Sequence, residues 1–217
     1  MKSMTTYFAF LLIFCTQFYQ VKSDDVPKII ADFMCTSNGY YDDGTQISEG
    51  DAYRDYIQSV TTPVTVPAFD KSVTILGQGI ENGKLRSLEL IVLNVTGENT
   101  ITAIPYNFTA PPNDTSTASI VKHLLTLKRE DFSTNPDCQG EITHTAPYVF
   151  TTQWPECIVT KNNKHPAYRV TVTCNDITFS ATSEGPEKLT LVDYDMRRRG
   201  LRFPLIYAPD NYVCECD

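Results

Sequence analysis

The sequence lacks the motifs by which many hydrolases and nucleotide-binding enzymes are recognised. It contains no Gly-x-Ser-x-Gly, no His-Glu-x-x-His and no glycine-rich phosphate loop. Histidine is scarce, and His123, His144 and His165 show no spacing that suits a metal site. Adjacent carboxylates such as Asp42 and Asp43 are usually solvated in turns. The residues themselves therefore supply no catalytic motif and favour a protein without enzymatic activity, metal or cofactor.

Positive charge and long apolar runs are also in short supply. The chain has 18 basic and 26 acidic residues, a net charge of −8. Such a surface repels nucleic acid and anionic membranes, so we expect neither as a partner. The apolar run at residues 7–14 is far shorter than the roughly 20 residues that cross a bilayer. With Lys2 before it and Val21 and Ser23 behind it, the run predicts a signal peptide over residues 1–23 and an extracellular location.

Cleavage after Ser23 would leave residues 24–217, a length that suits a single domain. Cys15 lies in the predicted signal. An even number of cysteines in an oxidising compartment implies up to three disulfides, and the sequence leaves their pairing open. Cys214 and Cys216 are too close together to bond easily, so each is expected to reach a different partner. Zinc is the weaker alternative, because there is no Cys-x-x-Cys. The six remaining cysteines are Cys35, Cys138, Cys157, Cys174, Cys214 and Cys216.

Three glycosylation sequons support secretion. They are Asn94-Val-Thr, Asn107-Phe-Thr and Asn113-Asp-Thr. A glycan is bulky and must face solvent, so each of these asparagines is predicted to lie on the surface.

The spacing of apolar residues predicts a short helix near the mature start and then mostly strands. Residues 29–35 have helical spacing, residues 49–57 could form a second helix, and residues 119–127 fit a helix as well as a strand. From residue 60 onward, roughly eight to ten short segments with turn signals between them are typical of a barrel or sandwich. Asn82-Gly83 predicts a hairpin turn, and residues 189–194 and 203–207 are the last expected strands.

The basic cluster and the aromatic residues each admit more than one interpretation. Arg197, Arg198, Arg199 and Arg202 could form an anion site or a processing site, but a solvated turn that offsets Asp193 and Asp195 is favoured. The 12 tyrosines, 11 phenylalanines and one tryptophan mostly fill or cap a small barrel, while some line a ligand cavity. Trp154 is expected to be a packing anchor at one end.

The order of these features resembles the CpcT/CpeT family of phycobiliprotein chromophore lyases. The resemblance begins at Gly39-Tyr-Tyr-Asp-Asp-Gly-Thr-Gln46, a stretch that follows the first predicted helix. It covers nearly all of the mature chain. Its further positions are Gln78, Arg86, residues 104–108, Asp137, Cys138, Phe150, Cys157, residues 193–200 and residues 207–213.

The resemblance implies a lipocalin/calycin-like antiparallel β-barrel, often dimeric, with a cavity for a linear tetrapyrrole. Tyr41, Gln78, Arg86 and Tyr106 would then be the ligand-binding residues, with Arg86 paired to a ligand carboxylate. A secreted glycoprotein is separated from the cytoplasmic partners of a lyase. We therefore expect a binder of a hydrophobic or tetrapyrrole-like molecule. The alternatives are a structural or interaction protein of an extracellular matrix or fluid, and a lyase-like transfer activity.

Overall fold

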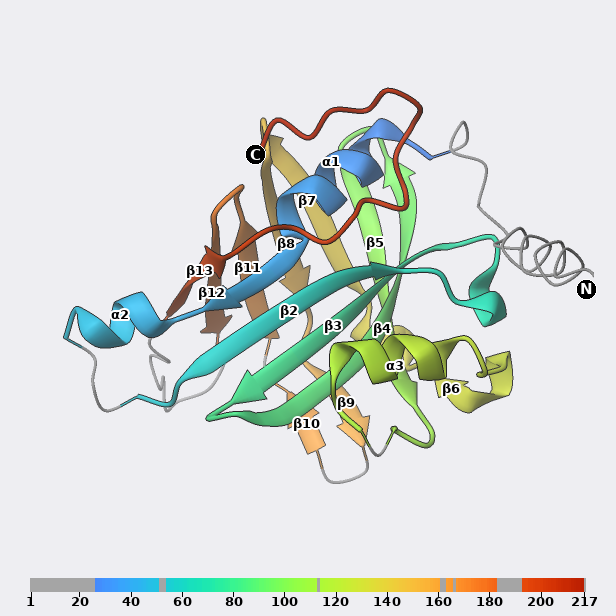
Figure 1. Cartoon of the computed structure of the whole chain (residues 1–217), viewed down its shortest axis with the longest axis horizontal. Coiled ribbons are helices and arrows are strands. Elements are labelled where there is room, and N and C mark those ends of the chain that lie inside the picture. Colours follow the sequence, from blue (N-terminus) through green and yellow to red (C-terminus); the bar gives the residue numbers. More distant parts are fainter. Residues whose placement is uncertain are drawn as a thin grey trace, which may run out of the picture.

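A computed structural model describes residues 26–50, 54–112, 114–160, 163–165, 167–182 and 193–216. In this part of the chain, ten antiparallel strands close into a barrel in the order β4-β3-β2-β1-β13-β12-β11-β8-β7-β5, and β5 pairs back with β4 (Figure 1). A short helix, α1 (Lys28–Ser37), precedes the first strand. The predicted mostly β, lipocalin/calycin-like barrel with a short N-terminal helix is confirmed.

The barrel strands are short except around the first hairpins. Asn82 and Gly83 have φ angles of 48° and 76° and form the predicted turn between β3 and β4. The bounds of the barrel strands are β1 Gly39–Asp42, β2 Ile57–Val64, β3 Val73–Glu81, β4 Lys84–Gly97, β5 Thr100–Phe108, β7 Gly140–Ala146, β8 Val149–Trp154, β11 Ala167–Val172, β12 Asp176–Thr182 and β13 Tyr194–Arg199. Outside the ring, β6 (Phe132–Ser133) extends β5, and β9 (Cys157–Thr160) pairs with β10 (Asn163–His165).

In the part of the chain that the structure describes, two further helices and three 3-10 turns lie between the strands, and two of the predicted elements are wrong. The second helix is α2 (Gly44–Ser48) rather than residues 49–57, because residue 57 already begins β2. Residues 203–207 are not a strand but part of an irregular C-terminal segment, and most of 189–194 lies outside the described residues. The ambiguous segment forms α3 (Thr117–Leu124); the 3-10 turns are η2 (Pro67–Phe69), η3 (Arg129–Asp131) and η4 (Pro136–Cys138). None of the described helices has the length and apolar character needed to cross a membrane.

Strand register separates an inner from an outer face all the way around the ring. Residues directly opposite each other in a ladder share a face, and their chain neighbours take the other face. Leu93 is opposite Ala103, and Phe150 is opposite Val172. Leu93, Ala103 and Phe150 pack in one cluster with Phe33 and Met34 of α1, which therefore fills one end of the barrel. The other members of this core cluster are Val26, Ile30, Ile75, Ile101, Ile142 and Tyr207.

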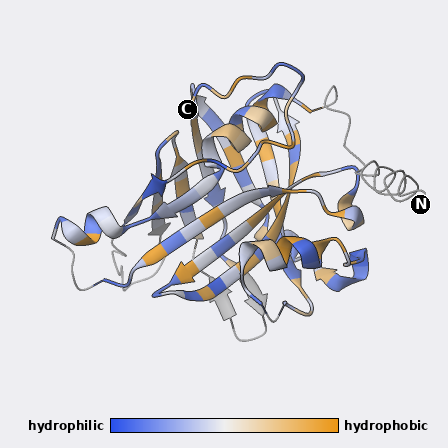
Figure 2. Cartoon of the chain, in the orientation of Figure 1, coloured by the Kyte–Doolittle hydropathy of each residue, from blue (hydrophilic) through white to orange (hydrophobic). Residues whose placement is uncertain are grey.

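The outer face of β3, β4 and β5 is buried as well, because α3 covers it. Ile120 and Leu124 of α3 pack on Leu76 and Leu90 together with Phe69. Hydrophobic residues occur along β3 and β4 and on α3 (Figure 2). The barrel wall is therefore apolar on both sides in this region, and hydropathy alone does not tell its inside from its outside.

The C-terminal segment, residues 200–216, runs back across α1 and is held there by two disulfides (Figure 1). Cys214 bonds to Cys35 of α1, and Cys216 bonds to Cys174. The prediction that the two neighbouring cysteines reach different partners is confirmed. The third disulfide joins Cys138 to Cys157 and ties η4 to β9.

Candidate functional site

The inner face of the barrel is filled at the α1 end and open to solvent at the opposite end. Strands β11, β12 and β13 show this most clearly, because each has a buried inner residue at the α1 end and half-buried inner residues beyond it. The buried residues are Val172, Ile177 and Met196, with relative exposures of 4, 6 and 5 %. The half-buried ones are Val170, Tyr168, Phe179 and Tyr194. We call this open end the mouth.

Four aromatic rings form a continuous row on the inner wall of the mouth. Trp154 stacks on Tyr168 with ring centroids 6.0 Å apart, and Tyr168 contacts Phe179 at 4.7 Å. Phe179 meets Tyr194 edge to face at 6.4 Å. The rings come from four neighbouring strands, β8, β11, β12 and β13, and all four are half-buried. We call this row the aromatic arc.

One end of the aromatic arc carries charged groups. The guanidinium of Arg54 lies over the Tyr194 ring, 4.1 Å from its centroid, and donates a hydrogen bond to the carbonyl of Asp193 at 3.2 Å. Asp43 is fully buried, and its Oδ1 accepts a 2.9 Å hydrogen bond from the amide of Ile57. Burial raises the pKa of Asp43, although the Ile57 amide and the charge of Arg54 oppose the rise.

The other end of the aromatic arc borders a small cavity. Its volume is about 30 Å³, room for little more than a water molecule or two. Burial raises the pKa of Tyr168, and the negative charge of Glu89 raises it further, so this phenol stays neutral. The cavity is lined by Glu89, Pro105, Asn107, Asn135, Cys138, Trp154 and Tyr168.

A buried cation lies deeper in the barrel. Arg198 is opposite Tyr41 in the β1–β13 ladder, so both side chains are on the inner face. The Arg198 guanidinium lies 5.5 Å from the centroid of the Tyr41 ring, and its nitrogens have no contact with solvent. Tyr41 donates a 2.9 Å hydrogen bond to the carbonyl of Thr36 at the end of α1. Charge is therefore present inside the barrel as well as at its mouth.

The structure does not bring the four predicted ligand-binding residues together. Tyr41 is inside the barrel and fully buried. Gln78 and Tyr106 are on the outer face, where Gln78 accepts a hydrogen bond from Thr117 and Tyr106 accepts one from Arg129, both at 2.9 Å. Arg86 is exposed in the β3–β4 hairpin and pairs with Glu81 at 2.8 Å. Their role in binding stays a prediction.

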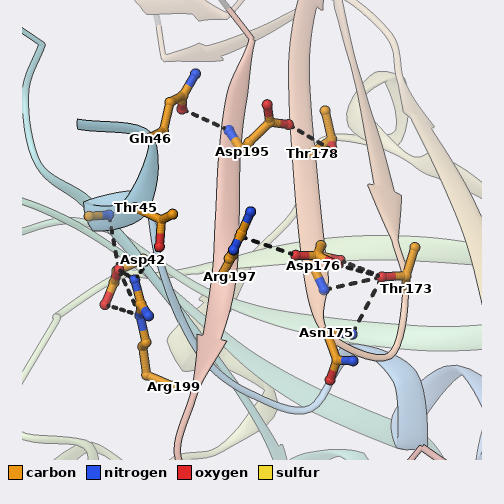
Figure 3. Close-up of polar contacts among 11 residues, drawn as sticks. Asp42, Thr45, Gln46, Thr173, Asn175, Asp176, Thr178, Asp195, Arg197 and Arg199 are labelled. Carbon is orange, nitrogen blue, oxygen red and sulfur yellow. Dashed lines mark hydrogen bonds and ion pairs between the residues drawn. The ribbon is translucent and has the colours of Figure 1, made fainter. Parts of the chain in front are cut away.

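The arginine cluster is not a solvated turn but part of β13, with its side chains on opposite faces. Arg199 points outward and forms a two-pronged ion pair with Asp42, with N–O distances of 2.9 to 3.1 Å (Figure 3). Arg197 reaches Asp176 at 4.0 Å (Figure 3). Arg202 lies beyond the strand and donates to the carbonyls of Cys35 and Cys174 at 2.8 and 2.9 Å.

Replacing Asp42 by asparagine should lower the free energy of unfolding at pH 7 by about 2 kcal/mol. Burial tends to raise the Asp42 pKa, but hydrogen bonds from Arg199 and the Gly44 amide hold the pKa below its ordinary value of 3.8. A depressed folded pKa stabilises the protein above pH 3.8, and this stabilisation is lost as the pH falls below that value.

Urea unfolding of Asp42→Asn and wild type at pH 7 and pH 3 measures this difference. The difference in the free energy of unfolding between the two proteins should be smaller at pH 3 than at pH 7. Asp195→Asn is the matched control, because Asp195 is exposed and accepts one side-chain hydrogen bond, from Thr178 at 3.0 Å (Figure 3). An equal loss for Asp42→Asn at both pH values would contradict the electrostatic explanation.

The sequence analysis did not single out the aromatic arc. Trp154 was expected to be a packing anchor at a barrel end, and it does lie at the end opposite α1. Tyr168, Phe179 and Tyr194 alternate with outward residues along their strands, a signal that marks one face of each strand without saying which face is inside. Arg54 had no sequence signal.

Comparison with known proteins supports the fold. No family model matches the chain, and no curated protein matches it. Two chains of solved structures match. One of them is the T-type phycobiliprotein lyase CpeT from Prochlorococcus phage P-HM1, with a TM-score of 0.51, 10% sequence identity, and coverage of 80% of this chain and 100% of that chain. Likeness at such low identity shows the fold alone, and the chain therefore has a CpeT-like, calycin-type barrel.

Proposed function

We propose that the protein is a secreted carrier that binds a flat, conjugated, bilin-like small molecule in the mouth of its barrel. The observation that carries the proposal is the loss of burial along the inner face, from a filled end under α1 to an open end lined by the aromatic arc. Pockets for small molecules are lined mainly by apolar and aromatic side chains with a few polar groups, and the mouth has this composition.

The flat faces of the aromatic arc favour a conjugated ligand, and Arg54 favours one that carries a carboxylate. Aromatic rings gain additional stabilisation when they stack on another planar, conjugated group. A guanidinium pairs well with a carboxylate. The fold likeness to a phycobiliprotein lyase makes a linear tetrapyrrole the natural first probe.

Secretion, glycosylation and homodimer formation belong to the proposal. Three disulfides support an oxidising compartment. A lyase-like transfer of the bound molecule would need a bilin-accepting partner. We favour binding without transfer, because the proposed extracellular location separates the protein from such a partner.

When biliverdin is titrated into the purified protein, the visible absorbance of biliverdin should change, and the change should saturate at one biliverdin per protein chain. Arg54→Gln should raise the dissociation constant roughly tenfold, because the carboxylate loses a charge-assisted contact. Arg169→Gln is the matched control: Arg169 is exposed on the outer face of β11, next to Tyr168. Equal effects of the two substitutions would contradict a site at the mouth.

The second candidate function is a structural or interaction protein without a small ligand. It is favoured by the filled α1 end and by the small size of the cavity beside Trp154, whose 30 Å³ is far below the roughly 300 Å³ of an ordinary ligand pocket. In this case biliverdin and other linear tetrapyrroles should leave the absorbance unchanged at every concentration tested.

A further inference from the structure

The sequons at Asn94 and Asn107 lie on opposite faces of the barrel wall. Asn94 is on β4, opposite Thr102 and one residue from the inward Leu93, so it points outward, and it is exposed. A glycan must extend into solvent, and the outward, exposed position of Asn94 allows this.

Asn107 points the other way. It is opposite Glu89 in the β4–β5 ladder, and both residues line the 30 Å³ cavity beside Trp154. The chain neighbours of Asn107, Tyr106 and Phe108, belong to the outer cluster under α3, as alternation along a strand requires. Asn107 itself is half-buried.

We propose that Asn107 stays unmodified and contributes its amide to ligand binding, whereas Asn94 carries a glycan. A sugar linked to Asn107 would begin in a cavity that holds little more than water and that Glu89 and Trp154 also line. The folded barrel therefore selects chains in which this sequon was left free. The binding part of this inference rests on the proposed function of the mouth.

The amide of Asn107 suits a ligand with polar groups along its edge. It offers two N–H donors and one carbonyl acceptor, so it can donate to a carbonyl or accept from an N–H. It lines the same cavity as Trp154 and Tyr168, which form one end of the aromatic arc. A planar ligand on the arc would thus present its edge to Asn107.

Mass spectrometry of the protein secreted from insect cells tests the modification. Asn113 lies outside the described residues. All proteins compared therefore carry Asn113→Gln, which removes the third sequon. Deglycosylation in heavy-oxygen water should label Asn94 and leave Asn107 unlabelled, and Asn94→Gln should remove the remaining glycan mass. A glycan on Asn107 in the folded, secreted protein would overturn the proposal.

Biliverdin titration tests the contact. Asn107→Ala should raise the dissociation constant several-fold. Thr109→Ala destroys the same sequon but keeps Asn107, and Thr109 is exposed and donates to the carbonyl of Asp131 at 3.0 Å, so it should change neither the glycan mass nor the affinity. Unchanged affinity in Asn107→Ala, with wild-type binding intact, would refute the contact. Absence of wild-type binding would instead refute the proposed function.

Discussion

Replacing Cys35 and Cys214 together by alanine should lower the free energy of unfolding by about 4 kcal/mol and the melting temperature by roughly 10 °C. The two cysteines are 179 residues apart, so the disulfide restricts nearly the whole unfolded chain. It also fastens the C-terminal segment to α1, whose buried face fills one end of the barrel.

Other contacts at the same place show that this segment is part of the fold. Tyr212 donates a 2.9 Å hydrogen bond to Asp32 of α1, and Asn38 and Phe203 exchange two hydrogen bonds. Loss of the disulfide should therefore weaken the closed end without disturbing the mouth. The double variant, at a temperature where it is folded, should still bind biliverdin.

The Cys138–Cys157 disulfide is the matched comparison. Its cysteines are only 19 residues apart, so removing it should cost about 3 kcal/mol, less than the loss of the long-range bond. This bond ties η4 to β9, and Cys138 lines the cavity. Its loss should therefore weaken biliverdin binding, whereas loss of the Cys35–Cys214 bond should not. Thermal melts of the two double-alanine variants show which one loses more stability. A larger drop in melting temperature without the Cys138–Cys157 bond would contradict the role given to the C-terminal segment.

The second large effect is expected at the centre of the aromatic arc. Tyr168→Leu should weaken biliverdin binding about fivefold, because aromatic stacking contributes roughly 1 kcal/mol beyond the apolar area. Tyr168 contacts both Trp154 and Phe179, so its loss interrupts the row of rings in the middle. Leucine keeps much of the apolar contact, so the change should appear mainly in affinity.

Tyr106→Leu separates the mouth from the site predicted through the family resemblance. Tyr106 is buried on the outer face and contacts Phe69 at 4.8 Å. If the mouth is the site, Tyr106→Leu lowers stability and leaves the dissociation constant within a factor of two. If Tyr106→Leu weakens binding more than Tyr168→Leu does, the ligand binds on the outer face and the mouth is not the site.

The fold was predictable because its signals are local. Short alternating segments, the Asn82-Gly83 turn and the helical spacing at residues 29–35 each predict their own element, and an antiparallel ring follows from many such elements in series. Where the prediction failed, local signals were absent or misleading. Residues 203–207 look like a strand, yet Tyr207 is buried through its ring and donates to the carbonyl of Val64 at 2.8 Å, which fixes the segment without a ladder.

The site was less predictable, because register and covering helices decide which face is inside. Gln78 and Gly77 are neighbours on β3, but only Gly77 faces the interior. Helix α3 covers Gln78, which is therefore as buried as an inner residue although it lies on the outer face. The sequence around Gln78 does not show on which face of the strand it lies. The aromatic arc joins four strands whose order in the ring no local pattern reveals.

Quenching of the chain's single tryptophan by biliverdin tests the central claim most directly. Trp154 is at one end of the aromatic arc, and no other tryptophan contributes to the signal. If a bilin-like ligand binds in the mouth, one equivalent should remove most of the Trp154 fluorescence at the same concentrations that change the visible absorbance. An absorbance change that leaves the Trp154 fluorescence intact would place the ligand elsewhere and contradict the account.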